Sequence, residues 1–475
     1  MQRVVGVGCW GTVVLAWASV TLTTGCRDAN AAVGEHELPD LATRHTGEDW
    51  PGFLGPRGDS KSAERGLATA WPEDGPPIKW QRPLNMSYGI GVIARGRYYQ
   101  LDRAGNEAQV HCWHSETGES LWTYSYPTNY EDHYGYNNGP RCSPVIDEDR
   151  VYAYGAEGML HCLHAATGEV IWKVDTRTQF GVVQNFFGVG STPIVEGELL
   201  IVVVGGSPPD AQDVAPGRLD LVNGNGSGIV AFEKRTGRVK YQLTDELAGY
   251  AGPVTATIGK RRWCFVFARG GLVAFDPTRG ELDFHYPWRA RPLESVNASN
   301  PVVVGDEVFI SETYGPGSSL LRVRPEGKGF DVVWRDEAHN RQKAMQTHWN
   351  TPIHHEGYLY GSSGRHTQNA ELRCIEWETG KPMWSQAGLT RGSLLYVDGQ
   401  FIYLGEDGVL RLIRATPERF ELRAECDLHG PAPTEPSEPR TKLLTYPAWA
   451  APILAHGLLY VRGNDRVVCL DLSTP

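Results

Sequence analysis

Short apolar stretches alternate with polar turns along most of the chain, in the same order several times over. One complete unit is residues 161–172, HCLHAATGEVIW: an alternating stretch, a Thr-Gly pair, then a stretch that contains Trp172. Alternation of apolar and polar residues predicts a half-buried β-strand. Glycine after threonine suits a hairpin turn that needs a positive φ angle. The pattern therefore predicts a β-hairpin that is repeated along the chain.

A glycine and an aromatic residue recur four positions apart in five of these units. The pairs are Gly118 and Trp122, Gly168 and Trp172, Gly237 and Tyr241, Gly280 and Phe284, and Gly380 and Trp384. A repeat of roughly 40–55 residues made of short strands indicates one β-propeller rather than several domains. Counting the units predicts an all-β, eight-bladed propeller, with seven blades as the alternative. The blades are expected near residues 87–122, 140–172, 190–241, 252–286, 299–334, 349–384 and 391–426, with an eighth that combines 447–475 and 76–82.

The last copy of the unit, residues 467–474, stops where its hairpin turn should come. The missing final strand is present near the other end of the chain, at Ile78, Lys79 and Trp80. A repeat array whose last strand comes from its own N-terminus is a closed ring, and closure removes exposed sheet edges. We therefore expect the segment around Lys79 to pair beside Leu470.

The first 26 residues differ in pattern from the rest of the chain. An apolar stretch at residues 4–22 is followed by Thr-Thr-Gly and Cys26, which predicts an export signal. Its end resembles the bacterial lipobox, which implies lipidation of Cys26 and a membrane-tethered protein on the periplasmic side. The alternatives are cleavage after the small residues at 29–31, or an uncleaved anchor, since about 20 apolar residues span a bilayer. The expected division is a signal at 1–26, a polar tether and strap at 27–75 and the propeller at 76–475.

Charge and residue spacing exclude several classes of site. A formal net charge of −11 argues against nucleic-acid binding, which needs a basic face. His111 and His114 lie three apart on a predicted strand and point to opposite faces, so they cannot chelate one metal ion, and no metal site is expected. No hydrolase elbow of the form Gly-x-Ser-x-Gly occurs, and no catalytic residue is predicted. Four cysteines hold one position in four repeats and are expected to be buried thiols in separate blades: Cys112, Cys162, Cys374 and Cys469.

Loop lengths predict that function lies on one face of the ring. The turns between first and second strands, and between third and fourth strands, share one face and are short throughout. The other face carries the remaining connections, and long ones are expected at residues 124–139, 207–226, 335–350, 361–370 and 428–447. Binding residues concentrate on loops that a rigid scaffold holds in place. We expect a partner to bind on this face.

One position in the repeat should recur around the mouth of the central channel. It lies three residues before each strand-opening proline, and its occupants are Arg141, Gly190, Tyr250, Ala298, Trp349 and Trp449. The neighbouring candidates are Asn137, Asn138, Asn185, Asn297 and His348. Aromatic rings, amides and a fixed cation suit a planar or peptide-like ligand, which they would bind by stacking and hydrogen bonds. The alternative is that the aromatic residues only fill the tunnel.

The Thr-Gly-(Glu/Lys)-x-x-Trp units resemble the repeat of the pyrroloquinoline-quinone (PQQ)-like propellers. That family includes quinoprotein alcohol dehydrogenases and the lipoprotein of the outer-membrane β-barrel assembly machinery, and the resemblance covers residues 76–475. It implies that the repeat tryptophans dock between neighbouring blades, at Trp80, Trp122, Trp172 and Trp384. A shared fold does not fix activity.

The dehydrogenases of this family hold their quinone beside a disulfide between adjacent cysteines, with a calcium ion bound by Glu, Asn and Asp. This sequence has no adjacent cysteine pair, and no such ligand set can be matched. The resemblance therefore implies a monomeric, non-catalytic propeller without cofactor, which binds an envelope protein or peptide. The alternative is a PQQ- and calcium-dependent dehydrogenase with divergent ligands. A third hypothesis, a polysaccharide hydrolase or lyase, rests only on the channel and its aromatic residues.

Overall fold

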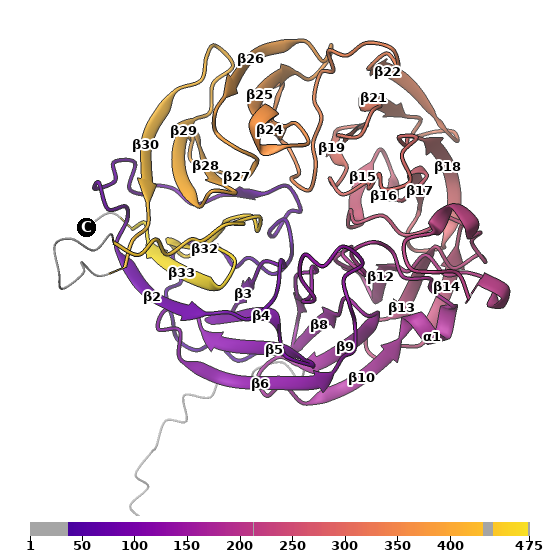
Figure 1. The fold of residues 1–475 in the computed structure, drawn as a ribbon, viewed down its shortest axis with the longest axis horizontal. Coiled ribbons are helices and arrows are strands. Elements are labelled where there is room, and N and C mark those ends of the chain that lie inside the picture. Colours follow the sequence, from indigo (N-terminus) through magenta and orange to yellow (C-terminus); the bar gives the residue numbers. More distant parts are fainter. Residues whose placement is uncertain (1–36, 212, 431–439, 474–475) are drawn as a thin grey trace, which may run out of the picture. The chain divides into compact units, whose positions relative to one another are not determined.

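Eight sheets follow one another around a ring (Figure 1), each with four antiparallel strands, and one of them carries a fifth, parallel strand. This computed structural model describes residues 37–211, 213–430 and 440–473, and the compact unit that contains the sheets begins at Leu38. The prediction of an all-β, eight-bladed propeller is confirmed, and the seven-bladed alternative is wrong. Cys26 and the predicted signal lie outside the described residues.

Within blades 1 to 7 the strands run outward from the channel in chain order, and in blade 8 the outermost strand is β2. Blades 1 to 4 comprise β3 (Val92–Ala94), β4 (Arg97–Ala104), β5 (Glu107–His114) and β6 (Ser120–Pro127); β7 (Val145–Asp147), β8 (Arg150–Tyr154), β9 (Met159–His164) and β10 (Val170–Asp175); β11 (Ile194–Glu196), β12 (Leu199–Val203), β13 (Ile229–Glu233) and β14 (Val239–Leu243); and β15 (Val254–Ile258), β16 (Arg261–Phe267), β17 (Gly271–Asp276) and β18 (Glu281–Pro287).

The second half of the ring repeats this arrangement. Blades 5 to 8 comprise β19 (Val302–Val304), β20 (Glu307–Glu312), β21 (Gly317–Val323) and β22 (Phe330–Arg335); β23 (Ile353–His355), β24 (Tyr358–Ser363), β25 (Glu371–Glu376) and β26 (Pro382–Ala387); β27 (Gly392–Val397), β28 (Gln400–Gly405), β29 (Val409–Arg414) and β30 (Leu422–Asp427); and β31 (Ile453–Ala455), β32 (Leu458–Arg462), β33 (Arg466–Asp471) and β2 (Ile78–Pro83). The short helices are α1 (Thr176–Phe180), η1 (Pro209–Ala211), η2 (Leu219–Leu221) and η3 (Thr367–Asn369). No helix in the described part of the chain is long and apolar enough to cross a membrane.

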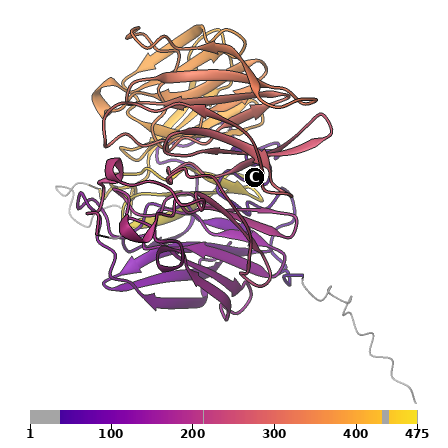
Figure 2. The same cartoon turned by 90° about the vertical axis from the view of Figure 1, so that its right-hand side faces the viewer.

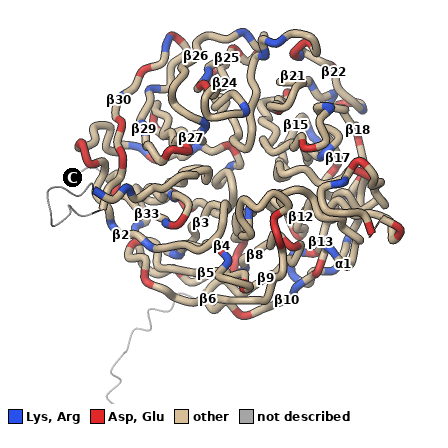
Figure 3. The backbone as a smooth tube through the Cα atoms, in the orientation of Figure 1, with Lys and Arg blue, Asp and Glu red and all other residues tan. Residues whose placement is uncertain are grey.

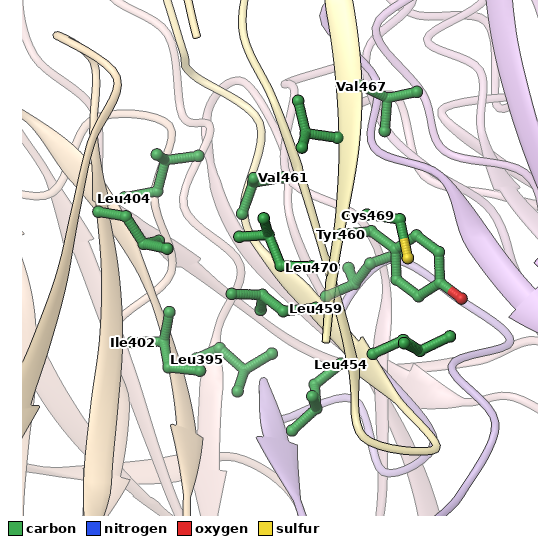
Figure 4. Close-up of a cluster of buried hydrophobic side chains, with 14 of the residues drawn as sticks. Leu395, Ile402, Leu404, Leu454, Leu459, Tyr460, Val461, Val467, Cys469 and Leu470 are labelled. Carbon is green, nitrogen blue, oxygen red and sulfur yellow. The ribbon is translucent and has the colours of Figure 1, made fainter. Parts of the chain in front are cut away.

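The two ends of the chain share the sheet of blade 8, as the interrupted repeat predicts. Strand β2 pairs antiparallel with β33, with Ile78 opposite Leu470 and Trp80 opposite Cys469. We call this pairing the seam. Beside it, apolar side chains from blades 7 and 8 form the largest buried cluster, part of which is shown in Figure 4. The ring is therefore closed both by the hydrogen bonds between β2 and β33 and by apolar packing between blades 7 and 8.

The repeat tryptophans connect five of the eight blades to the next blade. The indole Nε1–H donates to a backbone carbonyl of the following blade, over distances of 2.7–3.0 Å: Trp80 to Ser115, Trp122 to Ala165, Trp172 to Lys234, Trp334 to Trp377 and Trp384 to Thr416. Each of the first four rings also covers the hairpin glycine of that blade, so closely that an added Cβ would lie within 3 Å of it. Glycine is needed at these turns both for the positive φ angle and for the contact with the ring.

Gly237→Ala should destabilise the protein more than Gly197→Ala does. Both glycines have a positive φ angle, 71° and 57°, which costs an alanine about 1–2 kcal/mol. A Cβ at Gly237 would lie 2.7 Å from the Trp172 ring, whereas nothing lies within 4 Å of one at Gly197. Displacement of the ring should add about 1–3 kcal/mol. Urea unfolding measures both values, and equal losses would show that the tryptophan contact contributes nothing.

Residues 38–62, which we call the strap, cover one side of the central channel. Trp50 is 1% exposed and exchanges two backbone hydrogen bonds with Ile93 of blade 1. Farther on, β1 (Lys61–Ser62) pairs in parallel with β27 of blade 7, where the indigo chain reaches the ring centre in Figure 1. The innermost strands β3 and β31 are buried throughout and β27 is buried except at Tyr396, whereas β11 and β19 are half-exposed. The strap is therefore part of the propeller unit and makes its channel asymmetric.

The connections differ between the two faces, as predicted, although some loop bounds shift. All eight turns between first and second strands contain two residues. Long connections on the other face, which we call the long-loop face, are residues 128–144, 176–193, 204–228, 288–301, 336–352 and 428–452. The segment predicted as a loop at 361–370 is shorter, because β24 extends to Ser363. Figure 2 shows the ring edge-on, with the strands crossing its thickness.

Cysteine, histidine and charged residues fit this architecture. Seven cysteines of the described chain are buried free thiols, including the four that recur in the repeat. His111 bonds Asp102 through Nε2 over 2.9 Å, and no group of metal-ligating side chains occurs among the described residues. Lysine and arginine are interspersed with aspartate and glutamate around the ring (Figure 3). No sector of one sign, such as nucleic-acid binding would need, is present on the drawn backbone.

Candidate functional site

A cavity of about 740 Å³ opens where the long loops meet the channel. All six positions that precede a strand-opening proline line it: Arg141, Gly190, Tyr250, Ala298, Trp349 and Trp449. His348 lines it as well, and Phe53, Leu54 and Ser60 of the strap contribute to its wall. The volume is in the range of small-molecule and peptide-anchor sites. The repeat thus brings together residues up to about 300 positions apart in sequence.

One wall is built around a buried ion pair between Arg391 and Glu406. The carboxylate accepts from Arg391 at Nε (2.9 Å) and Nη2 (2.6 Å), and from Nε1 of Trp449 (2.9 Å). Trp349 donates to the Trp449 carbonyl, and the two rings lie 5.1 Å apart. The Arg391 guanidinium lies 4.5 Å from the Trp349 ring centre. Burial opposes ionisation of Glu406, but hydrogen bonds from Arg391, Trp449 and Thr367 outweigh it and lower its pKa.

His348 fills the space between this wall and Tyr314. Its Nε2 lies 3.0 Å from the Tyr314 hydroxyl, and its Nδ1 lies 3.4 Å from Nη1 of Arg391. Arginine can only donate, so Nδ1 accepts and Nε2 carries the proton. Burial and the nearby Arg391 charge lower the pKa of His348 to about 3. The imidazole is therefore neutral at physiological pH and connects Tyr314 to Arg391.

Arg141 supplies the fixed cation that the sequence predicts on the opposite wall. It pairs with the buried Asp132 and donates to the carbonyls of Gly139 and Asn137, both over 3.0 Å. Its guanidinium lies 5.6 Å from the ring centre of Tyr88, and two more rings, Tyr130 and Phe187, surround it at similar distances. The Asp132 carboxylate thus neutralises the charge of Arg141, and the planar face of the guanidinium packs among aromatic rings.

The four predicted asparagines form hydrogen bonds within and between the loops. Backbone groups of buried loops need partners, and these side chains supply them. Asn137 accepts from the Gly139 amide and Asn138 from the Asp132 amide; Asn185 donates to the Ala248 carbonyl and Asn297 to that of Ala268, all over 2.8–3.0 Å. None of the four borders the cavity. They position the loops that carry the lining residues.

Several lining residues escape the proline-based rule. Arg391 precedes the first strand of blade 7, where no proline stands at the strand opening. Tyr314 and Arg365 come from loops between second and third strands, which the rule does not address. Arg365 lies 4.4 Å from the Tyr314 ring centre and is exposed, and it has no ion-pair partner among the residues placed in the structure. For Arg391 the usable sequence signal was the spacing of the repeat, which places residue 391 directly before the first strand of a blade.

Glu312→Gln should change how stability depends on pH. Glu312 is 1% exposed and accepts from the amides of Tyr314 and Gly315, so it fixes the turn that presents Tyr314 to the cavity. Burial raises its pKa from 4.5 to about 7. A raised carboxyl pKa means that the folded state holds the proton more tightly, so stability falls as pH rises from 4.5 to 7, by about 3 kcal/mol.

The glutamine variant lacks this titration, so relative to the wild type it should gain stability between pH 5 and pH 8. Urea unfolding across that range measures the difference. Glu326→Gln, at an exposed turn of the same blade, controls for the loss of a charge. A constant difference between Glu312→Gln and the wild type at all pH values would contradict the assignment.

Comparison with known proteins bears on the fold and the family. A quinohemoprotein alcohol dehydrogenase from Comamonas testosteroni has a TM-score of 0.57 at 13% identity, with 91% of this chain and 82% of the enzyme covered. BamB from Moraxella catarrhalis has a TM-score of 0.54 at 14% identity, with 84% and 98% covered. These identities show a shared fold only. No curated protein matches the sequence significantly.

The family is shown by the repeat itself. The family model described as "Outer membrane protein assembly factor BamB" matches residues 129–386, more than half of the chain. That match spans blades 2 to 6, and the hairpins of blades 2, 3 and 6 carry the Thr-Gly turns described above, at Gly168, Gly237 and Gly380. The chain therefore belongs to the PQQ-like propeller family that bears this description.

Proposed function

We propose that this chain is a non-catalytic binding propeller of the cell envelope, which captures a segment of another protein at its long-loop face. The observation that carries the proposal is the cavity of about 740 Å³, ringed by aromatic side chains that remain exposed. Tyr134, Tyr136 and Tyr446 line it and are 44%, 64% and 58% exposed. Exposed tyrosines around a recess are typical of protein interfaces, where they supply contact area at low entropic cost.

The envelope setting is supported by two independent features. The matching family model is named for outer membrane protein assembly, and the first 26 residues have the pattern of an export signal that ends at Cys26. A membrane-tethered scaffold with a monomeric ring would present its long-loop face to envelope proteins. Export itself is tested by the N-terminal sequence of the mature protein.

The residues of the cavity do not fit a calcium-bound quinone, the alternative cofactor set. Calcium needs several free oxygen ligands, but Glu294 is the one carboxylate among the described residues that line the cavity. The two carboxylates behind the walls are already engaged, Asp132 with Arg141 and Glu406 with Arg391. Each described cysteine is a free thiol, and no two are adjacent in sequence. We therefore derive no redox chemistry for this cavity. Incubation with PQQ and calcium should give no dye reduction with alcohols.

Site-specific photo-crosslinking tests the binding function. A photo-reactive amino acid at Tyr136 or at Tyr446 should yield the same envelope-protein adduct in cells. The control position is Leu121, which is 41% exposed on the outer strand of blade 1, away from the cavity. An adduct that forms equally at Leu121, or no adduct at either tyrosine, would contradict the proposal.

A further inference from the structure

Two arginines outside the cavity wall converge on one backbone carbonyl. Arg269 lies in the turn between β16 and β17, and Arg289 lies in the loop that follows β18. The Nη2 atoms of both donate to the carbonyl oxygen of Leu293, each over 3.1 Å. The two Nη2 atoms are therefore close together, because both lie within hydrogen-bonding distance of the same oxygen. We call Arg269 and Arg289 the guanidinium pair.

No carboxylate of the described residues forms an ion pair with either arginine, although Glu246, Asp220 and Glu312 lie near enough to favour their charged forms. Glu246 is nearby, but its Oε1 lies 2.8 Å from His285 and its Oε2 accepts from the Gly270 amide. Asp220 is paired with Arg218 over 2.9 Å. Neither Arg269 nor Arg289 has an ion-pair partner within 4 Å in the described chain. By contrast, Arg141 and Arg391 at the cavity walls are each paired with a buried acid.

The pair is also partly withdrawn from water. Arg269 is 5% exposed and its guanidinium lies 5.7 Å from the Phe186 ring centre, while Arg289 is half-buried. Burial and the neighbouring Arg289 charge lower the pKa of Arg269 to about 10. Buried charges are normally paired, because an uncompensated one loses its hydration without electrostatic return. Two like charges held together in this way are a strained arrangement that an anion would relieve.

We propose that the guanidinium pair is a binding site for an oxyanion, a phosphate or carboxylate group that bridges Arg269 and Arg289. Nη1 and Nε of Arg269 and Nη1 of Arg289 make no hydrogen bond to any residue placed in the structure. Arginine presents its N–H groups in a planar fork that matches the oxygens of both groups. The two positive charges favour a dianionic phosphate over a single carboxylate.

Occupation of this site would also order the cavity rim. Leu293 belongs to loop 288–301, which carries the cavity-lining residues Glu294, Val296 and Ala298. Arg289 further donates from Nε to the Ser295 hydroxyl, over 3.2 Å. An anion bound between the two arginines would connect this loop, through Arg289, to Arg269 of blade 4. The site therefore lies beside the cavity and shares loop 288–301 with it.

Thermal unfolding of the full chain tests the site with inorganic phosphate as the probe. Phosphate replaces chloride at constant ionic strength, so general screening does not change. A ligand that binds only the folded state raises the melting temperature with its concentration. We expect such a rise for the wild type, and at least about tenfold weaker phosphate binding for Arg289→Gln by calorimetry. Acetate in place of phosphate shows whether a carboxylate is the better ligand.

The matched control is Arg291→Gln, which removes an equal charge from an exposed position of the same loop. It should bind the probe as the wild type does. Arg269→Gln is the second variant and should give the same loss as Arg289→Gln if it folds. Stabilisation by neither phosphate nor acetate would overturn the proposal, as would an equal response in Arg289→Gln and Arg291→Gln.

Discussion

Replacement of Trp80 by alanine is expected to lower the free energy of unfolding by about 3–5 kcal/mol, the range for a buried aromatic residue. Trp80 is 7% exposed, donates to the Ser115 carbonyl over 2.7 Å and packs edge-on against Tyr98 and Trp113. It also belongs to β2, so its loss weakens the seam as well as the contact with blade 1. Urea denaturation measures the effect.

Two measurements keep this prediction specific. Trp71→Ala removes a half-buried indole whose Nε1 bonds only locally, to Ala68, and should cost about 1 kcal/mol. Hydrogen exchange in Trp80→Ala should accelerate first in β2 and β33, because those strands make the seam. Uniform acceleration in all blades, or a cost no larger than that of Trp71→Ala, would count against the role of Trp80.

Arg391→Met should destabilise the protein by about 3–5 kcal/mol at pH 8, because it leaves a buried carboxylate without its counter-charge. In the ion pair, 12% of the Arg391 side chain and none of the Glu406 side chain are exposed. Without Arg391, burial dominates and the pKa of Glu406 moves above its ordinary value. A raised carboxyl pKa makes the folded state weaker as pH rises, so the loss should shrink at pH 5.

The control for this variant is Arg322→Met, which breaks an ion pair with Glu307 in which 55% of the arginine side chain is exposed. Surface pairs contribute little, and we expect a change below about 1 kcal/mol at either pH. Loss of the crosslinked adduct in Arg391→Met, with retention in Arg322→Met, would connect the wall to binding. A pH-independent cost for Arg391→Met would contradict the buried-carboxylate account.

The fold was predictable because nearly every blade repeats one local arrangement, a hairpin turn followed by a strand with an aromatic residue. The spacing of Gly168 and Trp172 encodes both a hairpin turn and the ring that covers the next hairpin, so sequence repetition reports spatial repetition directly. Closure was predictable for the same reason: the repeat ends at residue 474 without its aromatic strand, and Trp80 supplies it. Local pattern and global arrangement agree, as in sequences that fold to one structure.

The candidate site was predictable only where the repeat reaches it. Arg141, Trp349 and Trp449 keep a fixed distance from a strand-opening proline, and the structure places all of them at the cavity. Asp132 and Glu406, the acids behind the walls, have no fixed spacing from such a proline, because loop conformation sets their positions. The asparagines bond the loops and are not among the cavity-lining residues. Sequence does not show this, because a polar residue in a loop can equally face a ligand or satisfy the backbone.

The shared sheet of blade 8 also determines when the protein can finish folding during translation. Strand β2 leaves the ribosome early, yet its partner β33 is made only some hundreds of residues later. Until then, both ends of the nascent array present unpaired strand edges, which invite aggregation. Any product that terminates before Arg466 lacks the partner strand entirely. Synthesis of β33 is thus a condition for a stable ring, and chains that terminate before it should be recognisable to proteases.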